Sequence, residues 1–170
     1  KNGYNMYLVS LPVITLSGVL ILFLERWMPY EKDWIKGKGD WNLDLTYYII
    51  NYCIKLTAQY LLILLAQSIS FFNWFPKEQP FWLQVILALT IIDFFLFFVH
   101  LQSHKYKFLW NLHAIHHSSE RLYFLNGDKR HALHQLIEGG PGIIVCMVIG
   151  TPPVVIITAL ALLAVNMFMQ

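Results

Sequence analysis

The apolar residues of this chain come in long uncharged runs separated by short polar stretches, a pattern typical of helices that cross a membrane. The first run, residues 5–24, is about 20 residues long, which is enough to cross a hydrocarbon core of ~30 Å. It ends at Glu25, Arg26 and Trp27, a charged and aromatic edge typical of the membrane interface. The mixed-charge loop that follows, residues 28–43, has the composition of a solvated surface.

Two further membrane-spanning helices are predicted. The second covers residues 44–72 and is interrupted by Lys55, whose long stem can extend toward the nearer surface. The connection over residues 73–80 contains Pro76 and Pro80, which end helices because proline has no backbone N–H. The third helix begins at about residue 81 and continues into a histidine-rich stretch.

The last segment, residues 139–170, has no charged residue. As a single helix it would be about 48 Å long, which is too long for one crossing. The sequence Gly150-Thr151-Pro152-Pro153 divides it into two short arms. We therefore expect a membrane hairpin that enters and leaves on the same side.

Composition agrees with this pattern, since 57% of the 170 residues are hydrophobic and only 13% are charged. These values indicate one integral membrane domain over residues 1–170 rather than a soluble protein. The net charge of +2 gives no indication of a nucleic-acid partner. Cys53 and Cys146 lie in separate apolar segments, so no disulfide framework is indicated.

The distribution of lysine and arginine predicts the orientation in the membrane. Basic residues are frequent in the first loop and in the histidine-rich stretch, whereas the connection over residues 73–80 has only Lys77. By the positive-inside rule, the histidine-rich stretch is cytoplasmic. The predicted fold is an all-α integral membrane protein with three membrane-spanning helices, a cytoplasmic histidine-rich helical region and a C-terminal membrane hairpin.

All seven histidines lie between residues 100 and 134, and five of them have spacings suited to a metal ion. His100 and His104 form an H-x-x-x-H, and His113, His116 and His117 form an H-x-x-H-H. Residues three and four apart share one face of a helix, so each group can direct two or three imidazoles at one point. On one straight helix the two groups would face directions roughly 100° apart. The chain must therefore bend, at about residues 105–110, for both groups to meet.

The ligand type alone does not identify the metal, because imidazole suits zinc, copper, iron and nickel. The Glu-x-x-His pairs of soluble di-iron bundles do not occur, and neither does the H-E-x-x-H of zinc proteases. Seven imidazoles exceed what one tetrahedral ion requires, which makes two metal ions reasonable.

Three stretches of this region resemble the fatty acid hydroxylase and sterol desaturase family of membrane di-iron oxygenases. They are HLQSH at residues 100–104, KFLWNLHAIHHSSE at residues 107–120 and LNGDKRHALH at residues 125–134. The third departs from the family pattern, with Lys129 in place of arginine and Ala132 in place of proline. The resemblance covers about residue 25 to the end of the sequence.

The resemblance implies two non-haem iron ions and a set of ligands. The implied ligands are His100, His104, His113, His116, His117 and, from the partial third match, His131. His134 is a further candidate, as a ligand or as a hydrogen-bond partner of one. The family has another H-x-x-H-H after its last membrane hairpin. The sequence stops at Gln170 before that point, so we expect that the C-terminal part of the domain is missing.

Asp93 lies seven residues before His100, where the family also tends to have an acid. A carboxylate within a membrane helix is expensive unless it has a partner. It is expected either to orient a ligand histidine or to form a hydrogen bond between helices. If the second and third helices run antiparallel around residue 76, Gln59 and Tyr60 lie at the depth of Asp93 and are its expected partners.

The activity implied by the resemblance is iron-dependent oxidation of a lipid. The enzyme would use O2 and an external electron donor, a cytochrome b5-like or ferredoxin-like protein, to hydroxylate or desaturate a sterol or fatty-acyl C–H bond. It would lie in the endoplasmic reticulum of a eukaryote or in the inner membrane of a bacterium. A membrane metal-binding or metal-transport protein remains the alternative, although its ligands would be expected along a path through the bilayer. A haem protein is a third possibility, disfavoured because His116 and His117 are adjacent.

Overall fold

Helices are the regular elements of the chain, as its long apolar runs predict. The computed structural model describes residues 3–34, 36, 39–66, 71–120 and 123–168, and within these ranges it contains no strand. The elements are α1 (Gly3–Trp27), η1 (Lys32–Trp34), α2 (Trp41–Ala66), α3 (Phe81–Ser103), α4 (Lys107–His113), η2 (His116–Ser118), α5 (Phe124–Gly127), α6 (Ala132–Val148) and α7 (Pro153–Phe168).

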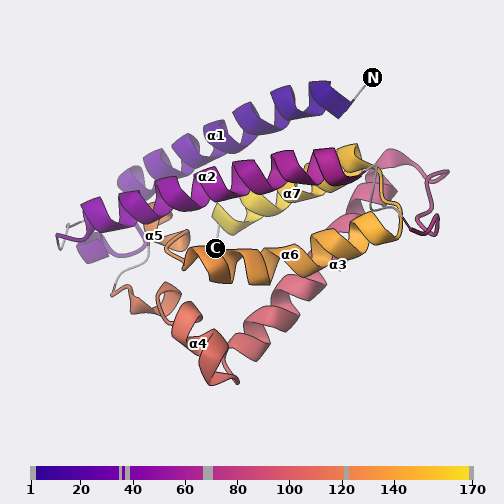
Figure 1. Ribbon diagram of the computed structural model, residues 1–170. Coiled ribbons are helices and arrows are strands. Elements are labelled where there is room, and N and C mark those ends of the chain that lie inside the picture. The colour runs from indigo at the N-terminus through magenta and orange to yellow at the C-terminus, as the bar shows by residue number, and fades with distance from the viewer. Residues whose placement is uncertain (1–2, 35, 37–38, 67–70, 121–122, 169–170) are drawn as a thin grey trace.

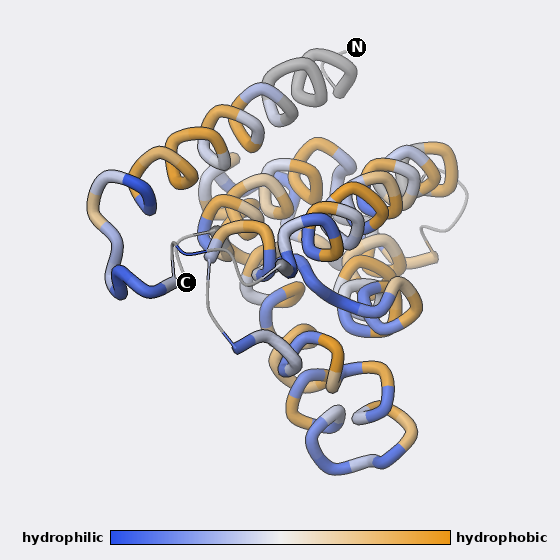
Figure 2. Tube along the Cα trace, turned by 90° about the vertical axis from the view of Figure 1, so that its left-hand side faces the viewer, coloured by the Kyte–Doolittle hydropathy of each residue, from blue (hydrophilic) through white to orange (hydrophobic). Residues whose placement is uncertain are grey.

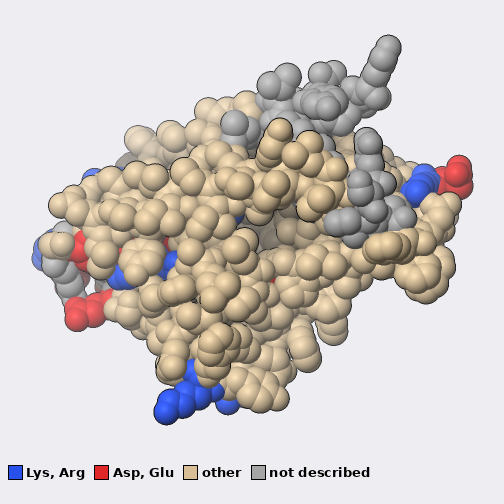
Figure 3. Space-filling view, viewed as in Figure 1, with Lys and Arg blue, Asp and Glu red and all other residues tan. Residues whose placement is uncertain are grey.

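The long helices form a bundle in which α3 packs mainly against α6 and α7, and α1 lies along α7 (Figure 1). Helix α4 turns away from the end of α3 at a corner of the molecule. Apolar residues run along the long helices, while hydrophilic residues gather in the loop between α1 and α2 and around α4 (Figure 2). The charged side chains on the face shown in Figure 3 lie mostly toward its edges.

Among the described residues one helix, α3, is long and apolar enough to cross a membrane, and α6 and α7 are shorter apolar helices. The aromatic side chains Phe94, Phe97 and Phe98 of α3 point outward and are about half exposed or more, as apolar surroundings would favour. Three membrane-spanning helices and the cytoplasmic position of the histidine region stay predictions.

The core is built where α3 meets the hairpin of α6 and α7. Ala88 and Ile92 of α3 pack with Cys146 of α6 and with Ile156 and Ala159 of α7, all of them almost completely buried. The closest approach is at Gly142, where an added Cβ would lie 2.7 Å from the Cα of Ile92. Only glycine allows α6 to come this near to the backbone of α3.

The last segment forms two helices separated by a turn, as expected, while its position in the membrane stays a prediction. Helices α6 and α7 are separated by the predicted break, where Gly150 has a φ of +86°, a conformation that glycine adopts readily. Helix α6 begins at Ala132, earlier than residue 139, so His134 and Glu138 belong to it.

A short segment between α2 and α3 closes the end of α6. The N–H of Phe72 donates to the carbonyl of Val148 at 3.0 Å, and those of Trp74 and Phe75 donate to Ile149 at 3.1 and 3.0 Å. These bonds satisfy carbonyls that a helix end otherwise leaves without partners. Helix α2 was predicted to extend to residue 72 but ends at Ala66, with residues 67–70 outside the described ranges.

In the described part of the chain, α2 and α3 are not the close neighbours that the expected partners of Asp93 require. Helix α2 packs against α5, α6 and α7, whereas α3 packs against α6 and α7, so the hairpin takes the place that α2 was expected to fill. Asp93 is exposed on α3, and none of the described residues, Tyr60 included, forms a hydrogen bond or ion pair with it. The side chain of Gln59 lies outside the described part.

The close approach at Gly142 can be tested with a matched pair of variants. Gly142→Ala should lower the free energy of unfolding by about 1–3 kcal/mol, because the new methyl group forces α6 away from α3. Gly140→Ala is the control. Its Cβ would meet nothing within 4 Å, and alanine favours a helix by roughly 0.5–1 kcal/mol over glycine. Thermal unfolding of the full-length protein in detergent would measure both, and equal shifts would contradict the packing described.

Candidate metal centre

The two histidine groups are brought together by a sharp bend at the end of α3. His104 follows the last residue of α3, and Tyr106 has an extended backbone, with φ −102° and ψ 122°, before α4 starts at Lys107. The bend lies at the predicted place. Helix α4 therefore returns toward the last turn of α3, and the H-x-x-H-H faces the H-x-x-x-H.

Four imidazoles converge at this corner. His100, His104, His113 and His117 each offer a ring nitrogen, and these nitrogens lie within 4.8 Å of one another. The Nε2 atoms of His100 and His104 are 3.3 Å apart, and those of His113 and His117 are 3.0 Å apart. Four nitrogens of neutral imidazoles around one point are a donor set suited to a transition-metal ion.

Glu138 of α6 fixes the orientation of His100. Its Oε1 lies 3.0 Å from Nδ1 of His100. An ionised carboxylate only accepts, so Nδ1 must carry the proton and donate it. The lone pair of His100 is then on Nε2, which faces the other three rings.

Arg130 forms an ion pair with this carboxylate. Its Nη1 donates to Oε2 of Glu138 at 2.6 Å, although only 4% of the glutamate side chain is exposed. A buried charge requires a partner, and here the guanidinium provides it. Sequence analysis did not identify Glu138 or Arg130, but Glu138 lies one turn after His134 and is the last charged residue before the uncharged segment.

His134 is held in a similar way by Ser103 of α3. The hydroxyl of Ser103 donates to the carbonyl of Val99 at 2.8 Å. Its oxygen is therefore left to accept from Nε2 of His134, at 2.9 Å. The lone pair of His134 is consequently on Nδ1, which is buried 3.9 Å from Oε2 of Glu138.

A second group of candidate ligands adjoins the first. Ring nitrogens of His113 and His134 and an oxygen of Glu138 lie within 4.8 Å of one another, and all three side chains are buried. Within the described residues, Nδ1 of His113 and Nδ1 of His134 have no hydrogen-bond partner. Buried polar atoms without partners are uncommon and are often explained by an ion or water. His113 belongs to both groups.

The other predicted ligands lie outside these two groups. The ring of His116 is 5.6 Å from that of His113 and 5.3 Å from that of His117, measured between centroids, but its nitrogens do not join either group. His131 caps α6, where its Nδ1 accepts from the N–H of Leu133 at 3.1 Å. Asp93 also lies outside both groups. Their roles as ligands stay predictions.

Burial keeps these imidazoles in the form that can bind a metal. It lowers the pKa of His113 to about 3, with the charges of His100 and His134 adding to the effect. Burial, followed by the charge of Arg130, lowers the pKa of His116 to about 4. The pKa of His117 is lowered as well, again mainly by burial. At neutral pH these rings are neutral and keep a free lone pair.

One aromatic ring, that of Trp110, packs against the group of four histidines. The ring of Trp110 stacks on His117 with 5.7 Å between centroids and is tilted against His104 at 5.4 Å. Beyond it the corner between α3 and α4 exposes Lys105 and Lys107, and basic side chains are visible there in Figure 3.

A buried polar network ties α2 to the chain around Arg130. Lys55 binds Asp128 at 2.6 Å, with 39% of its own side chain exposed. Asp44 accepts from the hydroxyl of Tyr123 at 2.7 Å and lies 3.1 Å from the ammonium of Lys129. Asn51 donates to the carbonyls of Asp128 and Arg130 at 2.7 and 3.0 Å. These contacts fix the backbone from which Arg130 reaches Glu138.

On the far side of Glu138 lies a cavity of about 1310 Å³. Side chains of α1, α2, α6 and α7 form most of its walls, and His116, Arg130 and Glu138 form part of its boundary. Glu138 thus borders the cavity and also contacts His100.

Comparisons with known proteins agree with this geometry. A family model described as fatty acid hydroxylase matches residues 85–170. The chain is 32% identical over 158 residues to the ornithine lipid hydroxylase OlsE of Rhizobium tropici, which covers 87% of this chain and 48% of that protein. It is 31% identical over 100 residues to a putative Delta(7)-sterol-C5(6)-desaturase 2 of Arabidopsis thaliana, covering 56% of this chain and 33% of that protein. The chain therefore spans half or less of these relatives, and no solved structure matches it.

Two substitutions should separate the converging histidines from His131. In the full-length protein, His104→Ala should remove most of the bound metal, because it deletes one of four convergent nitrogens. His131→Asn should keep the metal, since asparagine preserves a cap at the start of α6. Elemental analysis of the purified proteins would measure the metal. Metal loss in His131→Asn would instead make His131 a ligand.

Proposed function

The chain belongs to the fatty acid hydroxylase family, and from this premise we propose that it forms part of a membrane-bound, iron-dependent oxidoreductase that acts on a C–H bond of a lipid. The reaction is hydroxylation or desaturation with O2 as co-substrate and with electrons from a cytochrome b5-like or ferredoxin-like protein. The convergence of four histidines at the end of α3 is the observation that carries this proposal.

The donor sets support a site for two iron ions. His100, His104, His113 and His117 would hold one ion. His134 and Glu138 would contribute to the other, with His113 between the two, and the unpartnered nitrogens of His113 and His134 suit such a role. His116 and His131 are further ligands by family resemblance. Bound iron would supply the activation of O2 and the one-electron chemistry that side chains cannot perform.

The side chains around the site would orient the ligands and exclude water. Glu138 accepts from Nδ1 of His100 and is paired with Arg130. Ser103 sets the tautomer of His134 in the same way. Hydrogen bonds of this kind typically determine both the direction and the basicity of a ligating histidine. Trp110 packs against the rings of His104 and His117.

The relatives suggest the class of substrate. One is named for an ornithine lipid and the other for a sterol, so the proposed substrate is a membrane lipid that reaches the site from the bilayer. The cavity beside Glu138 is large and mostly apolar, which suits a lipid chain. The distribution of basic residues in the sequence favours a cytoplasmic position for the histidines.

The proposed activity can be tested on the full-length protein purified with iron. Incubation with membrane lipids, O2 and a reductant should give a lipid product that is heavier by one oxygen atom or lighter by two hydrogen atoms, detected by mass spectrometry. The product should disappear after removal of iron and return when iron is added back. Stoichiometric metal without any lipid product would favour the alternative of a metal-binding or transport protein.

Glu138→Gln tests the orientation of His100. The amide can present an N–H where the carboxylate accepted one, so Nδ1 of His100 loses its fixed proton and Arg130 loses its counter-charge. Metal affinity should fall by about 10–100-fold, measured by competition with a chelator. Glu78→Gln, on the exposed turn before α3, is the control and should leave the affinity unchanged. Equal affinities of the two variants would show that Glu138 does not orient the ligand.

A further inference from the structure

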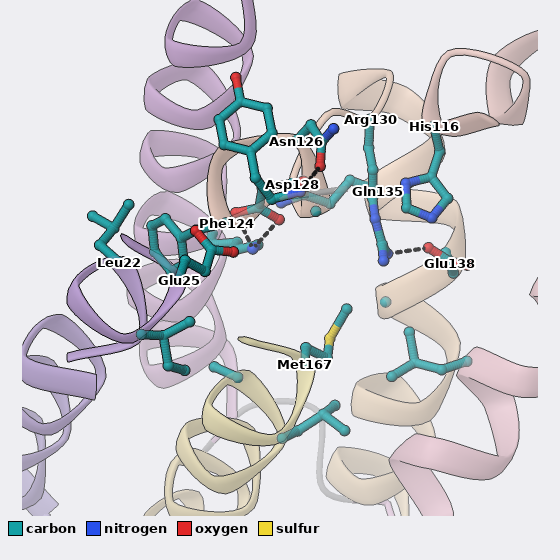
Figure 4. A pocket seen from close by; sticks show the side chains of 18 of the residues that line it. Leu22, Glu25, His116, Phe124, Asn126, Asp128, Arg130, Gln135, Glu138 and Met167 are labelled. Atoms are coloured by element: carbon teal, nitrogen blue, oxygen red, sulfur yellow. Dashed lines mark hydrogen bonds and ion pairs between the residues drawn. The ribbon is translucent and has the colours of Figure 1, made fainter. Parts of the chain in front are cut away.

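The cavity beside the histidines has two chemically different sides. Its volume of about 1310 Å³ exceeds the roughly 300–1,000 Å³ of sites for small ligands. One side is lined by apolar residues of α1, α6 and α7, among them Leu22, Ile143 and Met167. The other side gathers charged residues, and Figure 4 shows Glu25, Asp128, Arg130 and Glu138 together there, with Met167 across the cavity.

The charges of this side are mixed and nearly balanced. The basic side chains along the cavity are Arg26, Lys55 and Arg130, and the acidic ones are Glu25, Glu31, Asp128 and Glu138. Two of the pairs are close, with 2.6 Å between Lys55 and Asp128 and 2.6 Å between Arg130 and Glu138. A ligand that carries only positive or only negative charge would be repelled by about half of these groups.

Polar atoms on this side also remain without partners in the described chain. Arg130 uses Nη1 for Glu138, but its Nε is buried and forms no hydrogen bond. The amide oxygen of Gln135 and Nδ1 of His116 are in the same situation, and both residues border the cavity. These three atoms are themselves inaccessible, so an occupant would meet the exposed parts of the ion pairs beside them, and an entirely apolar occupant would desolvate those charges without compensation.

We propose that this cavity binds a zwitterionic membrane lipid with its headgroup at the charged side. The amino group of the lipid is placed at Glu25, the anionic group is placed at Arg130, and the chain lies along the apolar side. This deepens the proposed function, on which it rests, by naming the class of substrate. A sterol has a single hydroxyl group and cannot match both signs of charge, whereas an anionic lipid lacks the group that Glu25 would bind.

The position of the charged side has a consequence for the reaction. His116 and Glu138 border the cavity there, and Glu138 also contacts His100. The headgroup side of a bound lipid is therefore nearer to the histidines than the end of its chain.

The experiment is a competition between lipids for the full-length protein in detergent, read by native mass spectrometry. The probes carry identical acyl chains and differ in the headgroup: phosphatidylethanolamine is zwitterionic, phosphatidylglycerol is anionic and diacylglycerol is neutral. A sterol is the fourth probe. Phosphatidylethanolamine should be retained in preference to the others by about tenfold, the effect of one charge-assisted hydrogen bond.

Matched variants identify the site. Glu25→Gln keeps the shape and an acceptor oxygen but removes the negative charge, so the preference for phosphatidylethanolamine over phosphatidylglycerol should be lost. Glu78→Gln, which lies outside the cavity lining, should keep it. Equal retention of diacylglycerol or sterol, an unchanged preference in Glu25→Gln, or no retained lipid would each overturn the proposal.

These outcomes are independent of catalysis, because binding is measured without O2 and without an electron donor. Selective binding without turnover would count against the oxidoreductase and leave the lipid site in place. Turnover of a sterol without selective binding of the zwitterion would support the oxidoreductase and overturn the zwitterionic lipid site.

Discussion

The contact between Gly142 of α6 and the backbone of Ile92 of α3 determines much of the rest of this structure. It lets the two helices approach until a single added methyl group would collide with the backbone. One turn before Gly142, Glu138 can then reach His100, and one turn before that, His134 meets Ser103. Two hydrogen bonds that orient histidines therefore depend on a residue that has no side chain.

The buried charges around the histidines form a connected arrangement. Glu138 is shared by Arg130 and His100, and the backbone near Arg130 is held by Asn51 of α2. Three ion pairs hold these charges: Lys55 with Asp128, Lys129 with Asp44 and Arg130 with Glu138. In each pair the nitrogen and oxygen atoms are no more than 3.1 Å apart. Removal of one member of such a pair leaves the other uncompensated, and that penalty exceeds what the pair itself contributes. The helices α2 and α6 are thereby linked through polar atoms although most of their surface is apolar.

The sequence was informative about local features and less so about partners across the fold. The limits of α3, the bend after Ser103 and the break at Gly150 follow from proline, glycine and histidine spacing, which act within a few residues. The position of α2 could not be obtained in this way, because it depends on the hairpin of α6 and α7 filling the space beside α3. The contact of Lys55 with Asp128 was not foreseen for the same reason. Glu138 and Ser103 were not recognised, since neither belongs to a histidine motif and their roles arise only where α3 and α6 meet.

The hydrogen bonds from Phe72, Trp74 and Phe75 to the end of α6 bear on how deep the hairpin can lie. In the hydrocarbon interior no water is present to bind carbonyl groups, so an open helix end is excluded from it. Here protein N–H groups take the place of water at Val148 and Ile149. The tip of the hairpin is thereby attached to the connection that carries the exposed Lys77 and Glu78, at the end of α3 opposite to the histidines.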